Sequence, residues 1–299
     1  MLPLESVPNV SEGRDAAVLS EVADAFSEHA RLLDLHSDVD HHRSVLTLVG
    51  DDDGIVASLV AGVAKAIELI DLRRHDGVYP RVGAADVVPV VPLVPEDMER
   101  AKRAALAVAE RVAEELRIPA FLYGAAGGGR RPAFFRAGGT EALQQRLDSG
   151  ELSADYGPSR LHSTGGAVIV GARPPLIAFN VDLATDDVEI ARSIAAAVRE
   201  SGGGFSGVRA LGLALPRSCR VQVSMNVEDW EAAPLHDVVA RIEAEARVRG
   251  TVLAGSELVG LMPAGAALRA AAPALGLVEL GPARILELRL LEAEAVDGS

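Results

Sequence analysis

The chain is poor in several residue types, and each scarcity limits what the protein can be. A single cysteine in 299 residues rules out an internal disulfide, so nothing indicates an oxidising compartment. Aromatic residues make up only 3%, so the core must be built from Ala, Val and Leu. No segment reaches the roughly 18 unbroken apolar residues of a membrane span, and no basic segment precedes an apolar run at the start. We therefore expect a cytoplasmic protein with no membrane partner.

Positive charge is also scarce. The 29 Lys and Arg residues face 43 Asp and Glu residues, for a formal net charge of -14. Nucleic acid is excluded as a partner, because a phosphate backbone is bound through clustered Lys and Arg. Small anionic substrates stay possible through local arginines. A hydrophobic content of 49% suits a globular protein of one large or two ordinary domains.

Apolar periodicity predicts the same order of elements twice. The first half has strands at 2–10, 31–37, 43–50 and 85–93, with helices at 14–29 and 54–71. The second half has strands at 176–183, 208–215, 219–227 and 251–260, with helices at 186–200 and 235–249. Each half reads βαββαβ, which is the ferredoxin-like pattern.

The fold class is therefore α/β (α+β), with two ferredoxin-like subdomains, each a mixed sheet covered by helices. We place the subdomains at 1–174 and 175–299, because Pro174 and Pro175 interrupt a strand there. Pro89 and Pro92 argue against a fully paired central strand at 85–93. A cleft between two such units would be a natural ligand site.

Two polar segments, each taken by itself, have residues that could bind a ligand. The glycines and arginines of "AAGGGRRP" at 125–132 could cradle a phosphate, although the loop lacks the frames of known phosphate-binding motifs. The segment "HSDVDHHRS" at 36–44 holds carboxylates and imidazoles that suit a hard metal ion. The preceding residues lack the second His and Asp cluster of the manganese phosphoesterases, so a hairpin that presents side chains to an organic ligand is favoured, and we expect no metal.

Taken together, several motifs point to one family. "VPNVSEGRD", "LLDLHSDVDHHRSVLTLVG", "HDGVYPRVGAADVVPVVPL", "YGPSRLHSTGGAVIVGARPPLIAFNVDL" and "GSELVGLMP" resemble glutamate formiminotransferase, in order and along nearly the whole chain. The resemblance implies transfer of a formimino group from N-formimino-L-glutamate to tetrahydrofolate, in the one-carbon metabolism of histidine degradation. It also implies a cytoplasmic homodimer whose two subdomains enclose the folate.

The resemblance further implies a folate-binding loop, in which glycines would let the backbone approach a flat pterin closely. Its residues are Gly157, Pro158, Ser159, Arg160, Leu161, His162, Ser163, Thr164, Gly165 and Gly166. His36, Arg43 and Arg81 are the candidates for binding the substrate, since a guanidinium can pair with a glutamate carboxylate through two hydrogen bonds.

The chain departs from the family at residue 79. The family's catalytic histidine stands where this sequence has Tyr79, and many relatives have Asn where it has His42. A phenol titrates near about 10, so Tyr79 could accept a proton only as a stabilised phenolate. We name Tyr79 and His42 as catalytic candidates. Tyr79 could instead orient the substrate by hydrogen bonding while a histidine moves the proton, and His42, His36, His75 and His162 are the groups that could do so. A transferase that uses another one-carbon donor, and a folate-binding protein without activity, stay open as alternatives.

Overall fold

The computed structural model describes residues 2–78, 80–278, 280–286 and 288, and the chain divides into two units. The first contains residues 1–175 with 215–218, and the second contains residues 176–214 and 219–299. Each unit is described by itself below. Within the described ranges, none of the helices combines the length and the apolar character that a membrane crossing needs.

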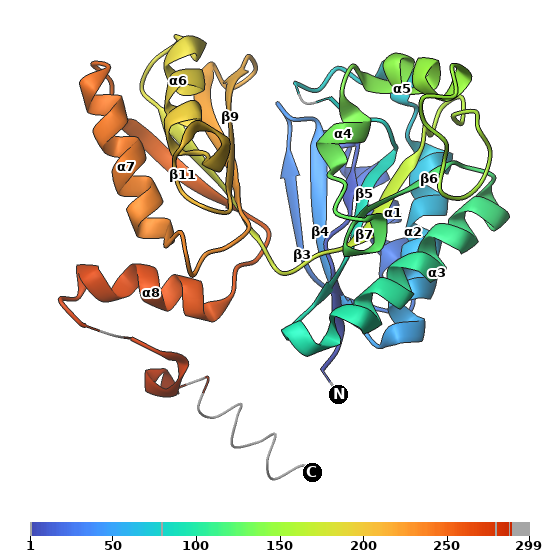
Figure 1. The fold of residues 1–299 in the computed structure, drawn as a ribbon, viewed down its shortest axis with the longest axis horizontal. Helices are drawn as coiled ribbons and strands as arrows, with labels where there is room; N and C mark the ends of the chain where they lie inside the picture. The colour runs from blue at the N-terminus through green and yellow to red at the C-terminus, as the bar shows by residue number, and fades with distance from the viewer. Residues whose placement is uncertain (1, 79, 279, 287, 289–299) are drawn as a thin grey trace. The chain divides into compact units, whose positions relative to one another are not determined.

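The first unit is a seven-stranded mixed sheet (Figure 1). β3 lies at one edge and pairs with β4, after which the order runs through β1 and β2, then β5, β7 and β6. β5, β7 and β6 are parallel, whereas the other pairs are antiparallel. Its strands are β1 (Leu4–Ser6), β2 (Asn9–Val10), β3 (Arg31–Asp38), β4 (Arg43–Gly50), β5 (Ala85–Pro92), β6 (Ala120–Gly124) and β7 (Val168–Ala172).

Helices cover both faces of this sheet, because alternate residues of the central strands face two separate cores. Val88 and Val90 of β5 belong to the core under the long helices, whereas Val87 belongs to the smaller core under α4 and α5. The helices are α1 (Ala16–Phe26), α2 (Asp52–Leu69), α3 (Met98–Leu116), α4 (Pro132–Arg136) and α5 (Gly139–Asp148).

β5 is a central strand with partners on both sides, but its pairing with β1 and β2 is interrupted beside Pro89, so it is not fully paired. The register explains how Pro89 fits there. Ser6 of β1 lies opposite Val90 and Asn9 of β2 opposite Val87, so the break between β1 and β2 falls beside Pro89. The missing N–H of Pro89 therefore costs no ladder bond on that side, and its carbonyl accepts a hydrogen bond from the Ser6 hydroxyl at 2.5 Å.

The second unit is a four-stranded sheet in the order β11-β8-β10-β9, with β8 antiparallel to β10 and β11. That order is the ferredoxin-like one, so the predicted α/β class with a repeated βαββαβ pattern is confirmed, although the mixed sheet lies in the first unit. The elements are β8 (Ile177–Leu183), α6 (Val188–Val198), β9 (Val208–Leu215), β10 (Arg220–Val227), α7 (Leu235–Val248), β11 (Leu253–Val259) and α8 (Ala264–Ala274). α8 was not predicted.

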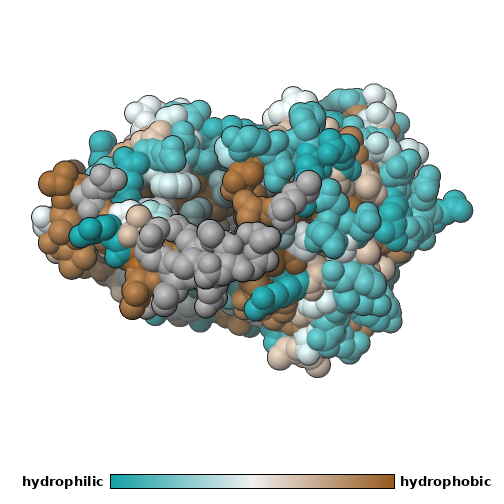
Figure 2. Space-filling view, turned by 90° about the horizontal axis from the view of Figure 1, so that it is seen from below, coloured by the Kyte–Doolittle hydropathy of each residue, from teal (hydrophilic) through white to brown (hydrophobic). Residues whose placement is uncertain are grey.

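Apolar side chains also reach the surface of the second unit near the end of the described chain. Leu275, Leu277 and Val278 are all exposed. Figure 2 shows hydrophobic surface lying among polar residues on one face of the molecule. Scattered exposed apolar residues are normal in folded proteins, so this surface by itself assigns no function.

α1 and α2 pack closely because α2 has a glycine at their contact. The Phe26 ring of α1 lies where a Cβ atom on Gly62 of α2 would stand, and both residues are buried. We expect Gly62→Ala to destabilise the protein by about 1–3 kcal/mol through overpacking, although alanine is the better helix former. Urea unfolding measures this. A variant as stable as the parent would show that the two helices can separate without cost.

Candidate active site

A buried arginine holds the tip of the β3–β4 hairpin against the loop that follows α2. Arg81 is 9% exposed, and it donates from Nη2 to the His41 carbonyl at 2.6 Å and from Nη1 to the His42 carbonyl at 2.9 Å. Burial lowers the pKa of Arg81 to about 10, with Asp86 acting in the opposite direction, so the guanidinium stays charged at neutral pH. These hydrogen bonds hold the backbone of the hairpin tip at His41 and His42.

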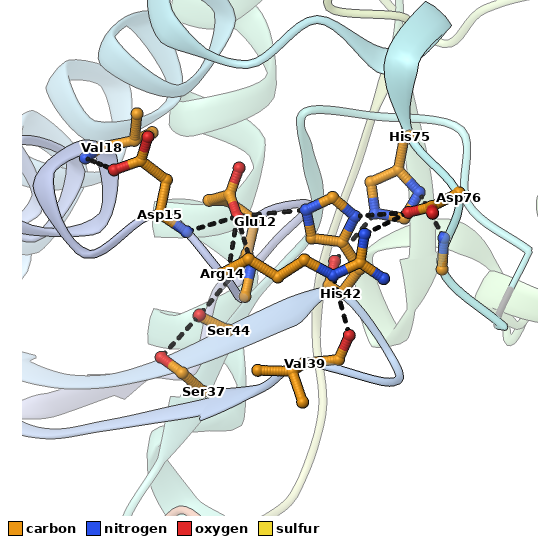
Figure 3. A network of polar contacts seen from close by, with 12 residues as sticks. Glu12, Arg14, Asp15, Val18, Ser37, Val39, His42, Ser44, His75 and Asp76 are labelled. Carbon is orange, nitrogen blue, oxygen red and sulfur yellow. Dashed lines mark hydrogen bonds and ion pairs between the residues drawn. The ribbon is translucent and has the colours of Figure 1, made fainter. Parts of the chain in front are cut away.

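The His42 ring lies between two carboxylates (Figure 3). Its Nε2 is 3.1 Å from Glu12 Oε1, and its Nδ1 is 3.2 Å from Asp76 Oδ1. Arg14 also pairs with Asp76, and that contact lowers the pKa of the Asp76 carboxyl. Only a doubly protonated imidazole can donate to both carboxylates at once. The arrangement therefore offers a carboxylate partner to each nitrogen of the His42 ring.

Glu12 anchors this cluster to the turn ahead of α1. Its Oε1 accepts backbone N–H groups of Gly13 at 2.9 Å, Arg14 at 2.7 Å and Asp15 at 3.0 Å. Burial opposes ionisation, but these hydrogen bonds together with His42 lower the pKa of Glu12 overall. The carboxylate that faces His42 is therefore charged and fixed in direction.

His75 is a neutral ring stacked on His42, with the centroids 4.3 Å apart. Its Nδ1 accepts the Gly77 N–H at 3.1 Å, so its Nε2 must carry the proton that is donated to the His42 carbonyl at 2.8 Å. Burial, with the nearby Arg81 charge, lowers the pKa of His75 to about 4. Both ring nitrogens are engaged, so His75 is poorly suited to accept a proton from a substrate.

The second half of the 157–166 segment lies beside the loop that carries Arg81. Leu72 donates its N–H to the Thr164 carbonyl and Ala84 donates to the Gly165 carbonyl, both at 2.9 Å. The His162 Nδ1 accepts the Gly165 N–H at 3.0 Å, so a neutral His162 carries its proton on Nε2. These bonds bring 162–166 and 72–84 together.

Gly166 is required where these two loops meet. It has a φ of 68°, in the left-handed region that glycine adopts without strain. A Cβ at this position would also meet the Val82 carbonyl. The backbones of the two loops therefore approach more closely than side chains would allow.

The first half of the segment, residues 157–161, contacts α5 instead. Gln144 accepts the Leu161 N–H at 2.8 Å and donates to the Ser159 carbonyl at 3.4 Å. Pro158, Ser159 and Arg160 are exposed. This half presents polar groups to the surroundings on a supported backbone.

The remaining predicted residues fall at different places. His36 is partly buried on the body of β3, opposite Val45, and Arg43 begins β4 directly after the hairpin tip. Tyr79 lies outside the described residues. The structure thus gathers His42, Arg81 and the second half of the 157–166 segment around one pair of loops, with His36 further along its strand.

In the two segments considered for a metal ion and for a phosphate, 36–44 and 125–132, polar side chains contact groups of the protein itself. In the 36–44 segment, the Asp38 carboxylate accepts the backbone N–H groups of Asp40 at 2.8 Å and His41 at 2.7 Å, and so shapes the hairpin turn. In the described part of the chain, no group of three or more His, Cys, Asp or Glu side chains is arranged to hold a metal ion. In the glycine loop, Arg130 donates to Asp155 at 2.6 Å.

Sequence reasoning assigned no role to Glu12, Arg14 or Asp76, which complete the cluster around His42. Glu12 and Arg14 belong to the "SEGRD" motif. An acidic residue directly ahead of a predicted helix is a sequence signal that could have indicated a role for Glu12. Asp76 gave no such signal, because a lone aspartate in a loop is most often a solvated residue.

The fold and the cluster define a two-unit α/β protein with a polar site built from loops of its first unit. The chain belongs to the formiminotransferase family: the N-terminal subdomain of the formiminotransferase domain matches residues 3–173, and the formiminotransferase domain matches residues 178–275.

Curated relatives agree along most of the chain. It is 42% identical to a glutamate formimidoyltransferase of Streptococcus pyogenes serotype M1, over 87% of this chain and 89% of the relative. It is 38% identical to a glutamate formimidoyltransferase of Thermoplasma acidophilum, over 97% and 98%. A formimidoyltransferase-cyclodeaminase of Sus scrofa is 39% identical over 90% of this chain and 52% of the relative.

The neutral state of His75 makes stability depend on pH. A folded pKa of about 4 against an ordinary value of 6.5 means that the unfolded chain takes up the proton first, so this contribution weakens as the pH falls from 6.5 to 4. His75→Gln cannot titrate and should make the decline shallower. Urea unfolding at several pH values measures the difference, and parallel curves for parent and variant would contradict the assignment.

Proposed function

We infer that this protein transfers the formimino group of N-formimino-L-glutamate to N5 of tetrahydrofolate. The observation that carries this conclusion is the match of both formiminotransferase domains across residues 3–173 and 178–275. Two relatives of nearly the same length, 42% and 38% identical, are named glutamate formimidoyltransferase. Tetrahydrofolate is a co-substrate in this reaction.

The reaction is a group transfer in which one carbon–nitrogen bond forms and another breaks. N5 of the folate attacks the formimino carbon, and the bond between that carbon and the glutamate nitrogen then breaks. The N5 proton leaves to an acceptor, and a proton must reach the departing glutamate nitrogen. The products are glutamate and 5-formimino-tetrahydrofolate. The site therefore needs one group that takes up the N5 proton. It also needs fixed positive charge near the negative charge that develops during the transfer.

We propose that Tyr79 and His42 share these tasks. Tyr79 stands at the family's histidine position and would accept the proton as a phenolate. A phenol titrates near about 10, so the phenolate needs neighbouring cations. Arg81, two residues along the chain, and the His42 ring are candidates for that charge. His36 and Arg43 stay proposals for binding the glutamate part of the donor, whereas the contacts of Arg81 with the hairpin tip favour a role in holding the loop.

We propose the 157–166 segment as the folate-binding loop. Its support is the pair of backbone hydrogen bonds from Leu72 and Ala84, which connect residues 164–165 to the loop that contains residue 79. A pterin held by this backbone would lie next to Leu72 and Ala84, which stand before and after residue 79 in the sequence. The boundary at 174/175, drawn from the prolines that interrupt a strand, a homodimer, drawn from the family resemblance, and a cytoplasmic location, drawn from the composition, are proposals.

The departure at Tyr79 favours one alternative function. A protein that binds folate but has lost the transfer, or that takes another one-carbon donor, would explain the replacement of the family's base by a phenol. The two cases differ in what purified protein does with the family's own substrates.

An assay with N-formimino-L-glutamate and tetrahydrofolate tests the function directly. The products are quenched in acid and read as methenyl-folate absorbance. We expect turnover by the parent and a loss of at least about tenfold in Tyr79→Phe, which lacks the phenol oxygen. Activity only in Tyr79→His would instead indicate an intact site without its proton acceptor, and the folate-binding alternative would replace the transferase.

Arg160 tests the folate loop. Because this side chain is exposed, Arg160→Ala should leave the fold intact and raise KM for tetrahydrofolate by about three- to tenfold, with kcat nearly unchanged. Arg103→Ala, at an exposed position of α3, is the matched control and should leave both constants at parental values. Equal KM values for Arg160→Ala and the control would remove Arg160 from the proposed folate contacts.

A further inference from the structure

The loop that contains residue 79 is fastened at both ends to one carbonyl group. The His42 carbonyl accepts a hydrogen bond from His75 Nε2 at 2.8 Å and another from Arg81 Nη1 at 2.9 Å. These donors flank residue 79 in the sequence. The direction of the His42 carbonyl therefore helps to fix the loop on each side of the proposed proton acceptor.

That direction depends on an unusual backbone conformation. His42 has a φ of 47°, in the left-handed region that is unfavourable for a residue with a side chain. A residue held there needs support from its surroundings. For His42 that support includes the contacts of its ring with Glu12 and Asp76.

The two carboxylates reach the ring from different segments. Glu12 belongs to the turn ahead of α1 and is itself fixed by three backbone N–H groups. Asp76 belongs to the loop itself, between His75 and residue 79. The Asp76 contact therefore adds a connection through a side chain of the hairpin tip to those made through its backbone carbonyls.

We propose that Asp76 is a positioning residue for the transfer reaction, which acts through the His42 ring to hold the 75–81 loop on the hairpin tip. The inference rests on the proposed function and extends it to a residue with no assigned role. Loss of the negative charge leaves only a neutral contact on the Nδ1 side of the ring. The loop then keeps its carbonyl contacts, but its connection through the His42 ring is weaker.

The charges around the ring favour this role. Glu12 and Asp76 face its nitrogens, neutral His75 stacks on it, and Arg81 binds the carbonyl of the same residue. Asp76 also pairs with Arg14 and, at 3.6 Å from its Oδ2, with Arg217 Nη2. The ring thus has a carboxylate on each side, and the removal of one leaves it with a single carboxylate partner.

The experiment compares Asp76→Asn with Asp76→Glu in the full chain. Asp76→Asn should lower kcat by about three- to tenfold, with KM for tetrahydrofolate unchanged, because a charge-assisted contact is replaced by a neutral one. Asp76→Glu restores the charge and should recover most of the loss. Asp71→Asn is the matched control: this aspartate pairs with Arg73 in the same loop region and should behave as the parent.

A second comparison separates positioning from a general effect on the fold. In a His42→Asn background the ring is absent, and asparagine tolerates the left-handed conformation. Asp76→Asn should then change kcat by less than about twofold. An equal loss in both backgrounds, or a parental kcat in Asp76→Asn alone, would overturn the proposal.

Backbone amide exchange gives a readout that does not need turnover. Val78 donates its N–H to the Asp40 carbonyl at 3.4 Å, and this bond lies in the loop that Asp76 is proposed to hold. Exchange at Val78 should be faster in Asp76→Asn than in Asp71→Asn. If the parent shows no transfer, the proposed function fails. Faster exchange at Val78 in Asp76→Asn than in Asp71→Asn still supports the connection between the loop and the hairpin tip, and equal exchange in the two variants rejects it.

Discussion

The site depends on the buried guanidinium of Arg81. A charge withdrawn from water is costly unless its donors are satisfied, and here two of them go to consecutive carbonyls, those of His41 and His42. The hairpin tip must therefore turn its carbonyls inward, and the left-handed conformation at residue 42 accomplishes this. The loop after α2 and the β3–β4 hairpin cannot separate without breaking these two hydrogen bonds of the buried guanidinium.

Asp86, at the start of β5, fixes the part of the chain that follows Arg81. Its carboxylate accepts the N–H groups of Val82 at 2.8 Å and Gly83 at 3.1 Å, and it also pairs with Arg136 of α4. The chain that follows Arg81 is thereby fixed just where it meets residues 165–167. The proposed folate loop and the loop of residue 79 thus share one support, so a change in either is expected to disturb the other.

The sequence predicts the parts of this arrangement that repeat and misses those that depend on distant pairs. Apolar periodicity located the strands and helices on both sides of residue 174, because packing onto a sheet imposes that period. It could not show that β5 lies at the centre of the sheet, since Pro89 is accommodated there by a gap between β1 and β2. It also could not pair Glu12 with His42 or His42 with Asp76, because nothing in their spacing of some thirty residues indicates contact.

The position of His42 bears on why this chain carries an imidazole at the hairpin tip and a phenol at residue 79. At residue 42 both ring nitrogens face carboxylates, so a neutral ring would turn a lone pair toward a negative oxygen. The ring is then better suited to carry charge than to accept a proton, and His75 is engaged at both nitrogens. A histidine moved from residue 79 to the tip would therefore not take over the base's task. It would supply positive charge to the loop, which is what a phenol needs in order to ionise near neutral pH.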